Sequence, residues 1–378
     1  MLKVGITGQS GFIGTHLYNY FSTKSSELIL IPFQDNLFLD RERLEDWTAE
    51  CDVIVHLAAI NRHENETLLY ETNIELVKQL VGALENTKRK PHVIFSSSSQ
   101  ESRDNIYGKS KKEGRKLLLS WAEQNGAKFT GLIIPNVFGP FGVPYYNSVV
   151  ATFCHQLTHS ELPGIDVDNF IKLIYVGELA EEIFNIIIEG KAGQEYYVQH
   201  TSEKKVSEIL HLLEQFKRKY FDDGIIPELN NRFELNLFNT FRTYYDFQKK
   251  YPVLTQKKID DRGFFAEMAR LEIGGQLSFS TTNIGITRGN HYHTRKIERF
   301  IVIKGEARIQ LRQIGKSEVM NFYLSGENPS YVDMPVWFTH NITNIGNEEL
   351  ITIFWINEFY NEKDPDTYFE MVDSVIYH

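Results

Sequence analysis

The sequence is that of an ordinary globular protein long enough for two domains, since its 378 residues exceed the length at which one hydrophobic core usually stops growing. Hydrophobic residues make up 42% and charged residues 24%, which excludes a disordered composition. The formal net charge of -10 offers no general electrostatic attraction for nucleic acid or for an anionic membrane.

Cysteine content and hydropathy predict the cellular compartment. Cys51 and Cys154 are too few for a disulfide scaffold or a Cys-rich zinc module, and they are typical of a reducing compartment. No cleavable signal pattern precedes the first glycine-rich motif. Apolar runs such as Val53–Ile60 and Ile351–Ile356 are far shorter than the ~20 residues needed to cross a bilayer. We expect a soluble cytoplasmic protein that neither inserts into membranes nor binds nucleic acid.

The first part of the chain, as far as Leu235, alternates short apolar strands with amphipathic helices. This alternation predicts a parallel sheet covered on both faces. The expected strands are Leu2–Thr7, Leu28–Phe33, Asp52–Ala59, His92–Ser97 and Thr130–Pro135. The expected helices are Phe12–Ser22, Glu71–Asn86 and Tyr107–Asn125.

The pattern changes after Asp260, where strands follow one another with turns of Gly, Asn and Pro between them. Such spacing predicts a β-sandwich or barrel. The expected strands are Gln276–Ile284, Glu298–Ile303, Glu306–Gln313, Glu318–Leu324, Tyr331–Met334 and Glu349–Asn357. We expect the join near Pro252, which divides the chain into domains of residues 1–245 and 253–378.

A glycine-rich turn follows the first strand and opens the first helix. Gly8, Gly11 and Gly14 have the spacing G-x-x-G-x-x-G, with Phe12 and Ile13 between the last two. The pyrophosphate of a dinucleotide must approach backbone N–H groups at a helix N-terminus, where side chains would obstruct it. A glycine-rich turn can be only a turn, but its place after the first strand favours nucleotide binding.

A tyrosine and a lysine follow at helical spacing. Tyr107 and Lys111 are four residues apart, so on a helix they share one face. A phenol with a pKa of about 10 is a poor catalyst at neutral pH, and a neighbouring ammonium would lower that pKa. The serine run Ser96–Ser99 ends the preceding strand, where parallel sheets bind ligands. The alternatives are a surface Tyr–Lys pair and a polar turn.

The second half contains a group of potential metal ligands. His291 and His293 are two residues apart and point to the same face of a strand. Glu298 is five residues past His293, an odd offset that requires a turn or bulge before Glu298 can join them. With His340, three imidazoles and one carboxylate suit a divalent metal such as Zn, Ni, Fe or Mn. A lone His-x-His is more often an exposed strand pair.

The glycine spacing, the strand Val53–Ala59, the serine run and the Tyr-x-x-x-Lys motif together resemble the extended short-chain dehydrogenase/reductases that act on nucleotide sugars. This resemblance implies that Gly8, Gly11, Phe12, Ile13 and Gly14 bind the cofactor. It further implies that Ser98 is the catalytic hydroxyl and Tyr107 the proton donor. Lys111 would bind the nicotinamide ribose, and Asn136 matches a substrate-side position.

The chain departs from this family's pattern in ways that affect function. Ser98 is followed by Ser99-Gln100 instead of the Asp-Glu pair of sugar dehydratases, so we do not expect dehydration. Ile133 stands where the family often has an arginine. The acid that binds the ribose 2′-hydroxyl in NAD enzymes is not clearly placed, since Gln34 and then Asp35 occupy the region. We therefore expect NADP(H), with Arg41 or Arg43 near the 2′-phosphate, and NAD stays an alternative.

The histidine-rich region resembles the cupins. The run from Gly285 to Gly305 matches the signature G-x5-H-x-H-x4-E-x6-G, and Met334–Asn344 resembles the second cupin motif with Trp337 in place of its glycine. The resemblance implies an all-β cupin barrel after a Rossmann-like, doubly wound parallel sheet. It also implies a bound divalent metal, with zinc expected, on His291, His293, Glu298 and His340.

Across essentially its full length the chain resembles the CapF-type bifunctional enzymes of bacterial capsule and O-antigen synthesis, including the stretches Tyr146–Cys154 and Asp364–Phe369. The resemblance implies a homodimer whose cupin epimerises C3 of a UDP-linked 4-keto-6-deoxy-HexNAc, while the reductase reduces C4. The product would be of the UDP-N-acetyl-6-deoxy-L-talosamine type, on the UDP-N-acetyl-L-fucosamine pathway. The alternatives are an NAD-retaining nucleotide-sugar epimerase without net redox change and a non-enzymatic NADP(H)/sugar sensor.

Overall fold

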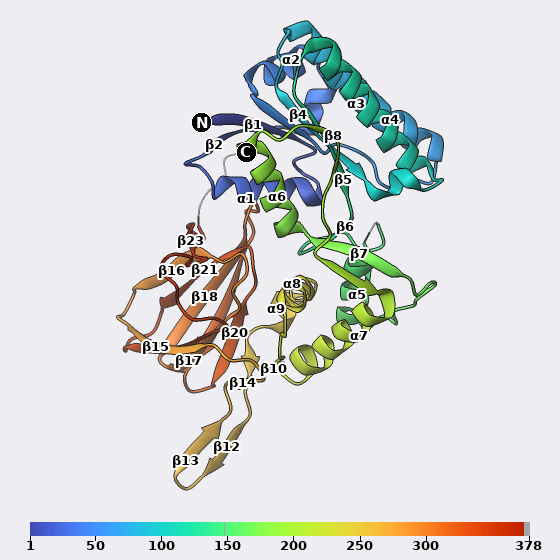
Figure 1. Ribbon diagram of the computed structural model, residues 1–378. Coiled ribbons are helices and arrows are strands. Elements are labelled where there is room, and N and C mark those ends of the chain that lie inside the picture. The colour runs from blue at the N-terminus through green and yellow to red at the C-terminus, as the bar shows by residue number, and fades with distance from the viewer. Residues whose placement is uncertain (147, 374–378) are drawn as a thin grey trace. The chain divides into compact units, whose positions relative to one another are not determined.

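The computed structural model describes residues 1–146 and 148–373 (Figure 1). Contacts among these residues group into two compact units. The first unit contains described residues of Met1–Thr152 and Ile165–Ser207, and the second contains Phe153–Gly164 and described residues from Glu208 onward. The predicted domain limits near Pro252 stay a prediction. Within the described chain, no helix is long and apolar enough to cross a membrane.

The first unit is built on a parallel sheet of six strands, which confirms the predicted doubly wound fold. Its strands in spatial order are β2 (Leu28–Ile31), β1 (Leu2–Thr7), β3 (Val53–His56), β4 (His92–Ser98), β5 (Phe129–Ile134) and β8 (Gly193–Tyr197). The chain runs from β1 outward to β2 and then returns to the other side of β1 for β3. Ligands of such sheets bind at the carboxyl ends of the strands, where the strand order reverses.

Helices cover both faces of this sheet and give it two hydrophobic cores. Val53 and Val55 of β3 pack on one face with α1 (Phe12–Ser22) and α6 (Val176–Glu189), while Ile54 packs on the other face. The second face is covered by α2 (Arg41–Glu50), α3 (Glu66–Thr87) and α4 (Ile106–Asn125). Because both faces are buried, the strands read as continuous apolar runs in the sequence.

Smaller elements complete the first unit. A short 3-10 turn, η1 (Asp35–Leu39), follows β2, and a second one, η2 (Ser99–Ser102), follows β4. A three-stranded sheet contains β6 (Asn136–Phe138), β7 (Phe170–Tyr175) and β9 (Ser202–Lys205).

The second unit contains two five-stranded antiparallel sheets, which confirms the predicted all-β region (Figure 1). One sheet has the order β11 (Val253–Leu254), β20 (Ser330–Met334), β17 (Glu298–Lys304), β22 (Leu350–Ile356) and β15 (Gln276–Thr282). The other has the order β19 (Val319–Ser325), β18 (Glu306–Gln313), β21 (Phe338–Asn344), β16 (Thr287–Tyr292) and β23 (Tyr368–Phe369). The sheets face each other, since the Phe300 ring of β17 meets the His340 ring of β21 at 5.5 Å.

Helices and short strands accompany the two sheets. The second unit contains the π-helical turn η3 (Lys217–Asp222), α8 (Arg232–Phe241) and α9 (Phe247–Lys250), together with most of α5 (Val149–Thr158) and α7 (Val206–Phe216), which begin in the first unit. The strands β12 (Lys257–Asp260) and β13 (Gly263–Ala266) form a projecting hairpin, and β10 (Ile225–Ile226) pairs with β14 (Arg270–Leu271). The Tyr220 hydroxyl of η3 donates to the buried Asp333 carboxylate of β20 at 2.9 Å, so η3 is fastened to the sheet.

Candidate active site and metal centre

The glycine-rich turn lies at the carboxyl end of β1 and leaves no room for side chains. Gly8 has a φ of +67°, and a Cβ there would lie 2.9 Å from the backbone nitrogen of Ala58, which follows β3. A Cβ on Gly14 would lie 2.1 Å from the Gly8 carbonyl oxygen. Gly11 begins α1 without a side-chain cap, and α1 has no acid in its first turn. The turn thus has the close packing and the N-terminal N–H groups that a pyrophosphate requires.

The side chains beside this turn differ in their surroundings. Ile13 packs against the core of the first unit, and Phe12 contacts the buried His16 ring edge-on at 5.4 Å. His16 in turn hydrogen-bonds the Pro140 carbonyl at 2.8 Å, and burial lowers its pKa to about 4. These contacts tie α1 to the loop that follows β6.

Ser98 and Tyr107 are brought together by a glycine. Ser98 is the last residue of β4, and its Oγ accepts a hydrogen bond from the Gln100 backbone at 3.2 Å. A Cβ on Gly108 would lie 2.1 Å from the Gln100 carbonyl oxygen. The first turn of α4, which contains Tyr107, therefore packs directly against the turn that follows Ser98.

Burial governs the ionisation of Tyr107 and Lys111. Burial raises the pKa of Tyr107, and the nearby Tyr146 phenol adds to this effect. The direction is opposite to the lowering that we expected from Lys111. The Lys111 ammonium, buried to 3% exposure, donates to Ser96 Oγ at 3.4 Å and lies 4.7 Å from the Phe95 ring centre. Burial lowers the pKa of Lys111 to about 7.

Glu101 is the first acid after Ser98, and it is engaged elsewhere. Its carboxylate accepts from Ser97 and forms an ion pair with Arg115 at 2.7 Å. Arg115 is only 5% exposed and pairs with Glu195 at 2.8 Å as well. The Glu101 carboxylate is therefore committed to Ser97 and Arg115, and the expectation that the chain does not catalyse dehydration stays a prediction.

The region expected to meet the adenosine ribose presents a carboxylate. Asp35 begins η1 after β2, and its Oδ2 accepts from Ser10 Oγ of the glycine-rich turn at 2.8 Å. Arg41 is paired with Glu45 at 2.9 Å. The structure thus places an acid, hydrogen-bonded to Ser10 of the glycine-rich turn, in the region where we expect the adenosine ribose.

Three polar side chains connect segments of the first unit, and one of them, Asn136, is the residue that we expected on the substrate side. Asn136 begins β6, is exposed, and donates to the Lys172 carbonyl at 3.1 Å. Tyr146 accepts from the Asn61 backbone at 3.0 Å, which ties its loop to the segment after β3. Asn73 of α3, which we had not singled out, bonds Ile60 at 2.7 Å and Ser110 at 3.0 Å. The sequence does not distinguish Asn73 from Gln79 and Asn86, the other amide side chains of the same amphipathic helix.

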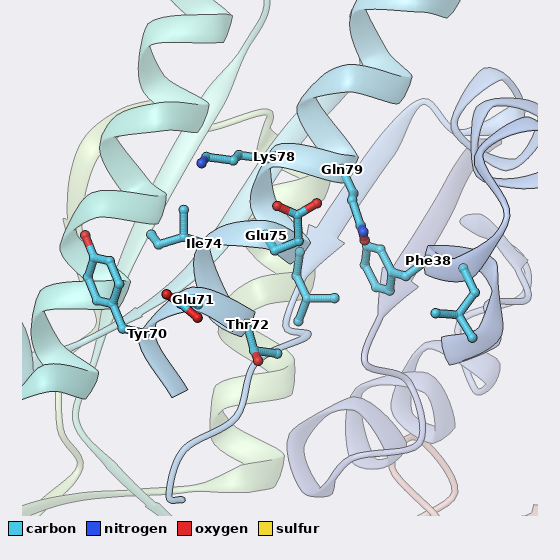
Figure 2. Close-up of a pocket in the computed structure, with 10 residues that line it drawn as sticks. Phe38, Tyr70, Glu71, Thr72, Ile74, Glu75, Lys78 and Gln79 are labelled. Carbon is cyan, nitrogen blue, oxygen red and sulfur yellow. The ribbon is translucent and has the colours of Figure 1, made fainter. Parts of the chain in front are cut away.

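A surface pocket of about 610 Å³ in the first unit lies between η1 and α3 (Figure 2). It is lined by Phe38, Leu39 and one face of α3, including Glu71, Glu75 and Lys78. Since none of the predicted site residues lines it, we assign the pocket no part in the chemistry.

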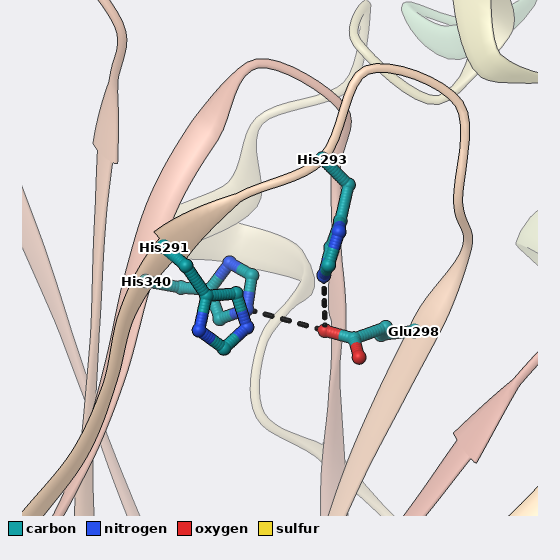
Figure 3. Close-up of side chains that lie close together, drawn as sticks. All are labelled: His291, His293, Glu298 and His340. Atoms are coloured by element: carbon teal, nitrogen blue, oxygen red, sulfur yellow. Dashed lines mark ion pairs between the residues drawn. The ribbon is translucent and has the colours of Figure 1, made fainter. Parts of the chain in front are cut away.

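The four predicted metal ligands meet between the two antiparallel sheets (Figure 3). His291 is the penultimate residue of β16, His293 directly follows that strand, His340 is in β21, and Glu298 begins β17 of the facing sheet. Their ligand atoms lie within 4.8 Å of one another. Glu298 Oε2 is 3.0 Å from His293 Nε2 and 3.2 Å from His340 Nε2. The turn required between His293 and Glu298 is present.

The hydrogen bonds around the cluster fit a bound cation. His340 Nδ1 donates to the Phe338 carbonyl at 3.1 Å, and His293 Nδ1 donates to the Asp366 carbonyl. Nε2 of both rings faces the Glu298 carboxylate; burial would lower the pKa of His293, but the carboxylate raises it above its usual value, so positive charge is favoured at this point. Apart from one another, the buried Nε2 and Oε2 atoms have no hydrogen-bond partner among the described residues. Converging lone pairs of this kind need a positive charge between them.

The ionisation of the cluster also suits metal binding. Burial would raise the pKa of Glu298, but the adjacent His293 holds it well below its usual range. Burial lowers the pKa of His291 to about 3, with a further contribution from His340. An ionised carboxylate and a neutral imidazole are the forms that bind a divalent metal.

Family comparisons match both parts of the chain. Residues 4–198 match the NAD dependent epimerase/dehydratase family, and residues 258–368 match the polysaccharide biosynthesis C-terminal domain. A UDP-2-acetamido-2,6-beta-L-arabino-hexul-4-ose reductase of Pseudomonas aeruginosa is 31% identical over 374 residues, or 97% of this chain and 98% of the relative. The Bacillus subtilis spore coat polysaccharide biosynthesis protein SpsL is 31% identical over 120 residues, covering 29% of this chain and 80% of the relative.

Solved structures give the same result. The capsular polysaccharide assembling protein CapF of Staphylococcus aureus is 33% identical with a TM-score of 0.61, covering 98% of this chain and all of that chain. The Pseudomonas aeruginosa protein RMD, solved with NADPH, is 21% identical with a TM-score of 0.52 over 58% of this chain and 83% of its own, which supports the fold alone. The chain therefore belongs to the CapF-type enzymes of the NAD dependent epimerase/dehydratase family, which act on nucleotide sugars.

Proposed function

We propose that this chain is a bifunctional enzyme acting on a UDP-linked 2-acetamido-2,6-dideoxy-4-hexulose. The β unit epimerises C3, and the first unit reduces the C4 ketone to give a UDP-N-acetyl-6-deoxy-L-talosamine-type product on the UDP-N-acetyl-L-fucosamine pathway. The main support is that one chain contains both the Tyr107 constellation and the His291 cluster. The full-length Pseudomonas relative is named as a reductase of such a hexulose.

The first unit has the groups that carbonyl reduction requires. Hydride from a reduced nicotinamide makes an alkoxide at C4, and that oxygen must receive a proton as it forms. Burial raises the pKa of Tyr107, so its phenol is protonated at neutral pH, and it can donate because the alkoxide that forms at C4 is a far stronger base than a phenolate. Ser98 Oγ would hold the same oxygen from the adjacent turn. Lys111 would hydrogen-bond the nicotinamide ribose.

The β unit has the groups that C3 epimerisation can use. The 4-keto group acidifies the C–H bond at C3, so a base can remove that proton and return it on the opposite face. A divalent metal, for which we propose zinc, would polarise the carbonyl as a Lewis acid or stabilise the fold. His291, His293, Glu298 and His340 would hold it. Both reactions thus depend on one carbonyl group.

The choice between NADP(H) and NAD(H) depends on whether the site accepts a phosphate at the 2′ position of the adenosine ribose. The sequence led us to expect NADP(H) with NAD(H) as the alternative. The Asp35 carboxylate near the expected ribose would repel a 2′-phosphate and accept a bond from a 2′-hydroxyl, so its position supports NAD(H). We also propose that the enzyme is a cytoplasmic homodimer, as expected for its family.

The decisive experiment supplies the purified enzyme with a panel of UDP-4-keto-6-deoxy-HexNAc sugars in D₂O, with NADH or NADPH. The proposal predicts deuterium at C3 and stoichiometric oxidation of the reduced cofactor. An epimerase that retains NAD would exchange the proton with no net change in nicotinamide absorbance. A sensor would bind sugar and cofactor without converting either, and this outcome would refute the enzymatic proposal.

A further inference from the structure

Asp366 shapes the turn between two metal ligands. Its Oδ1 accepts from the Thr294 backbone at 3.0 Å and from Thr294 Oγ1 at 2.6 Å. Its Oδ2 accepts from the backbones of Arg295 and Lys296, both at 3.0 Å. Three successive N–H groups after His293 therefore converge on one carboxylate, and the chain is turned so that Glu298 can begin β17.

The same residue also contacts a metal ligand directly. The Asp366 carbonyl accepts the Nδ1 proton of His293, which leaves the His293 Nε2 lone pair for the metal. Asp366 is only 2% exposed and has a φ of +41°, a left-handed conformation that few residues other than glycine adopt, although aspartate and asparagine adopt it more readily than most. An unfavourable conformation at a buried, fully bonded residue indicates that its surroundings impose it.

The segment around Asp366 is fastened to the strands that contain the other histidines. In β23, Phe369 pairs with His291 and Tyr368 pairs with Tyr292. Thr339, next to His340, donates to the Glu370 carbonyl.

A buried arginine holds the end of the same segment. The Arg312 guanidinium, with no exposed surface, donates to the Val372 carbonyl at 2.8 Å and to the Glu370 carboxylate at 2.7 Å. The segment from 364 to 372 thus contacts each strand or turn that holds a metal-binding histidine.

We propose that Asp366 is a positioning residue of the metal centre, setting the turn between His293 and Glu298 and the proton on His293. This inference rests on the proposed metal centre. Without the carboxylate, the loop 294–297 would lose the acceptor that its N–H groups share. The distance between His293 and Glu298, the two ligands at its ends, would then no longer be fixed. The C-terminal segment is then a required part of the site.

The test measures the affinity of the full-length protein for Zn²⁺ alone, by competition with a chromogenic chelator. In Asp366→Asn an amide N–H₂ faces the N–H donors that the carboxylate accepted, so we expect zinc to bind about 10- to 100-fold more weakly. Asp364→Asn is the matched control. It removes a carboxylate of the same segment that pairs with Arg295 at the surface, and its zinc affinity should equal that of the wild type.

A second measurement separates positioning from general stability. The Tm of the metal-free protein should be similar for the wild type and Asp366→Asn. Added zinc should raise the Tm of the wild type more than that of Asp366→Asn, because it binds the wild type more tightly. If Asp366→Asn fails to fold, Thr294→Val removes only the Oγ1 bond to Asp366, and it should bind zinc more weakly than the wild type.

Wild-type zinc affinity in Asp366→Asn, or in Thr294→Val where the first variant does not fold, would overturn the inference. A fall in the Tm of the metal-free protein large enough to explain the whole loss of zinc affinity would overturn it too. A wild-type protein that binds no divalent metal would instead refute the proposed metal centre.

Discussion

Tyr107 stands in the first turn of α4, where burial raises the pKa of its phenol above the ordinary value. If the phenol donates the proton to C4 oxygen, Tyr107→Phe should lower the rate of ketone reduction on the order of 10²-fold or more. The affinity for the reduced cofactor should change little. Stopped-flow oxidation of the cofactor and a binding titration check the two parts. Near-wild-type oxidation would remove Tyr107 from the mechanism.

Lys111 makes stability depend on pH. Because burial lowers its pKa from 10.5 to about 7, the unfolded chain binds more protons than the folded chain between these pH values. The unfavourable buried ammonium is therefore present in full below pH 7 and disappears as the pH rises toward 10.5. Lys111→Met should raise the free energy of unfolding most below pH 7 and flatten its rise above that pH. Urea denaturation of the cofactor-free protein across this range measures both. Parallel pH profiles would contradict the assignment.

Asp35 offers a residue-level test of cofactor choice. Two unit charges 4 Å apart repel by about 1 kcal/mol in water, and a 2′-phosphate has more than one charge. Asp35→Ser should therefore improve the affinity for NADPH relative to NADH on the order of fivefold or more. Glu42→Gln, which removes an exposed acid from α2, controls for net charge. Titrations followed by nicotinamide fluorescence give the ratio. An unchanged ratio in Asp35→Ser would place the ribose elsewhere.

The residues of both constellations could be predicted because their spacing reflects local geometry. Trp337 shows this well, since it occupies a motif position that favours glycine and has a φ of +63°. Its ring packs on Tyr292 at 5.7 Å, which compensates for the strained backbone. Asp366 could not be assigned a role in the same way, because its bonds join positions more than 70 residues apart. The ionisation of Tyr107 was also missed, since burial depends on the tertiary structure.

At the scale of elements, regular patterns predicted strands and helices equally well: α1 coincides with its expected limits and α4 begins one residue early, whereas β3 ends three residues before its expected limit. The strands β1, β4 and β18 lie at or within one residue of their expected limits because they are continuously apolar or alternate regularly. The helix α2 was missed because its sequence, RERLEDWTAE, is mostly charged and buries few residues. The attachment of η3 to the sheet was also missed, since it depends on polar groups far apart in sequence.

The η3 attachment rests on a buried ion pair. Arg299 Nε and Nη2 donate to the Asp333 carboxylate at 2.6 and 2.9 Å, and both residues are 1% exposed. Arg299→Met should cost about 3–5 kcal/mol of unfolding free energy, because it leaves the Asp333 charge buried and unpaired. The double variant Arg299→Met/Asp333→Leu should recover most of this loss. Chemical denaturation of the full chain measures the free energy of unfolding of the wild type, the two single variants and the double variant. Additive losses in the double variant would show that the two side chains do not depend on each other.

At the scale of the whole molecule, two compact units contain chemically different constellations. One contains the groups that we propose donate the proton and bind the cofactor, and the other contains the three histidines and one glutamate that we propose bind a metal. The proposed substrate links them through its chemistry, since its ketone both acidifies C3 and accepts hydride at C4. Each reaction should then continue when the other is disabled.

This independence can be measured with one substitution in each unit. Tyr107→Phe should stop cofactor oxidation yet leave deuterium exchange at C3, because enolisation needs no hydride. His340→Ala should lose the metal and slow the exchange, while the reductase should still oxidise cofactor with a ketone that already has the product configuration at C3. Mass spectrometry of the sugar and cofactor absorbance follow the two steps in the same sample. If exchange disappears in Tyr107→Phe and survives in His340→Ala, the exchange reaction depends on the first unit and not on the metal cluster. The two reactions would then have been assigned to the wrong units.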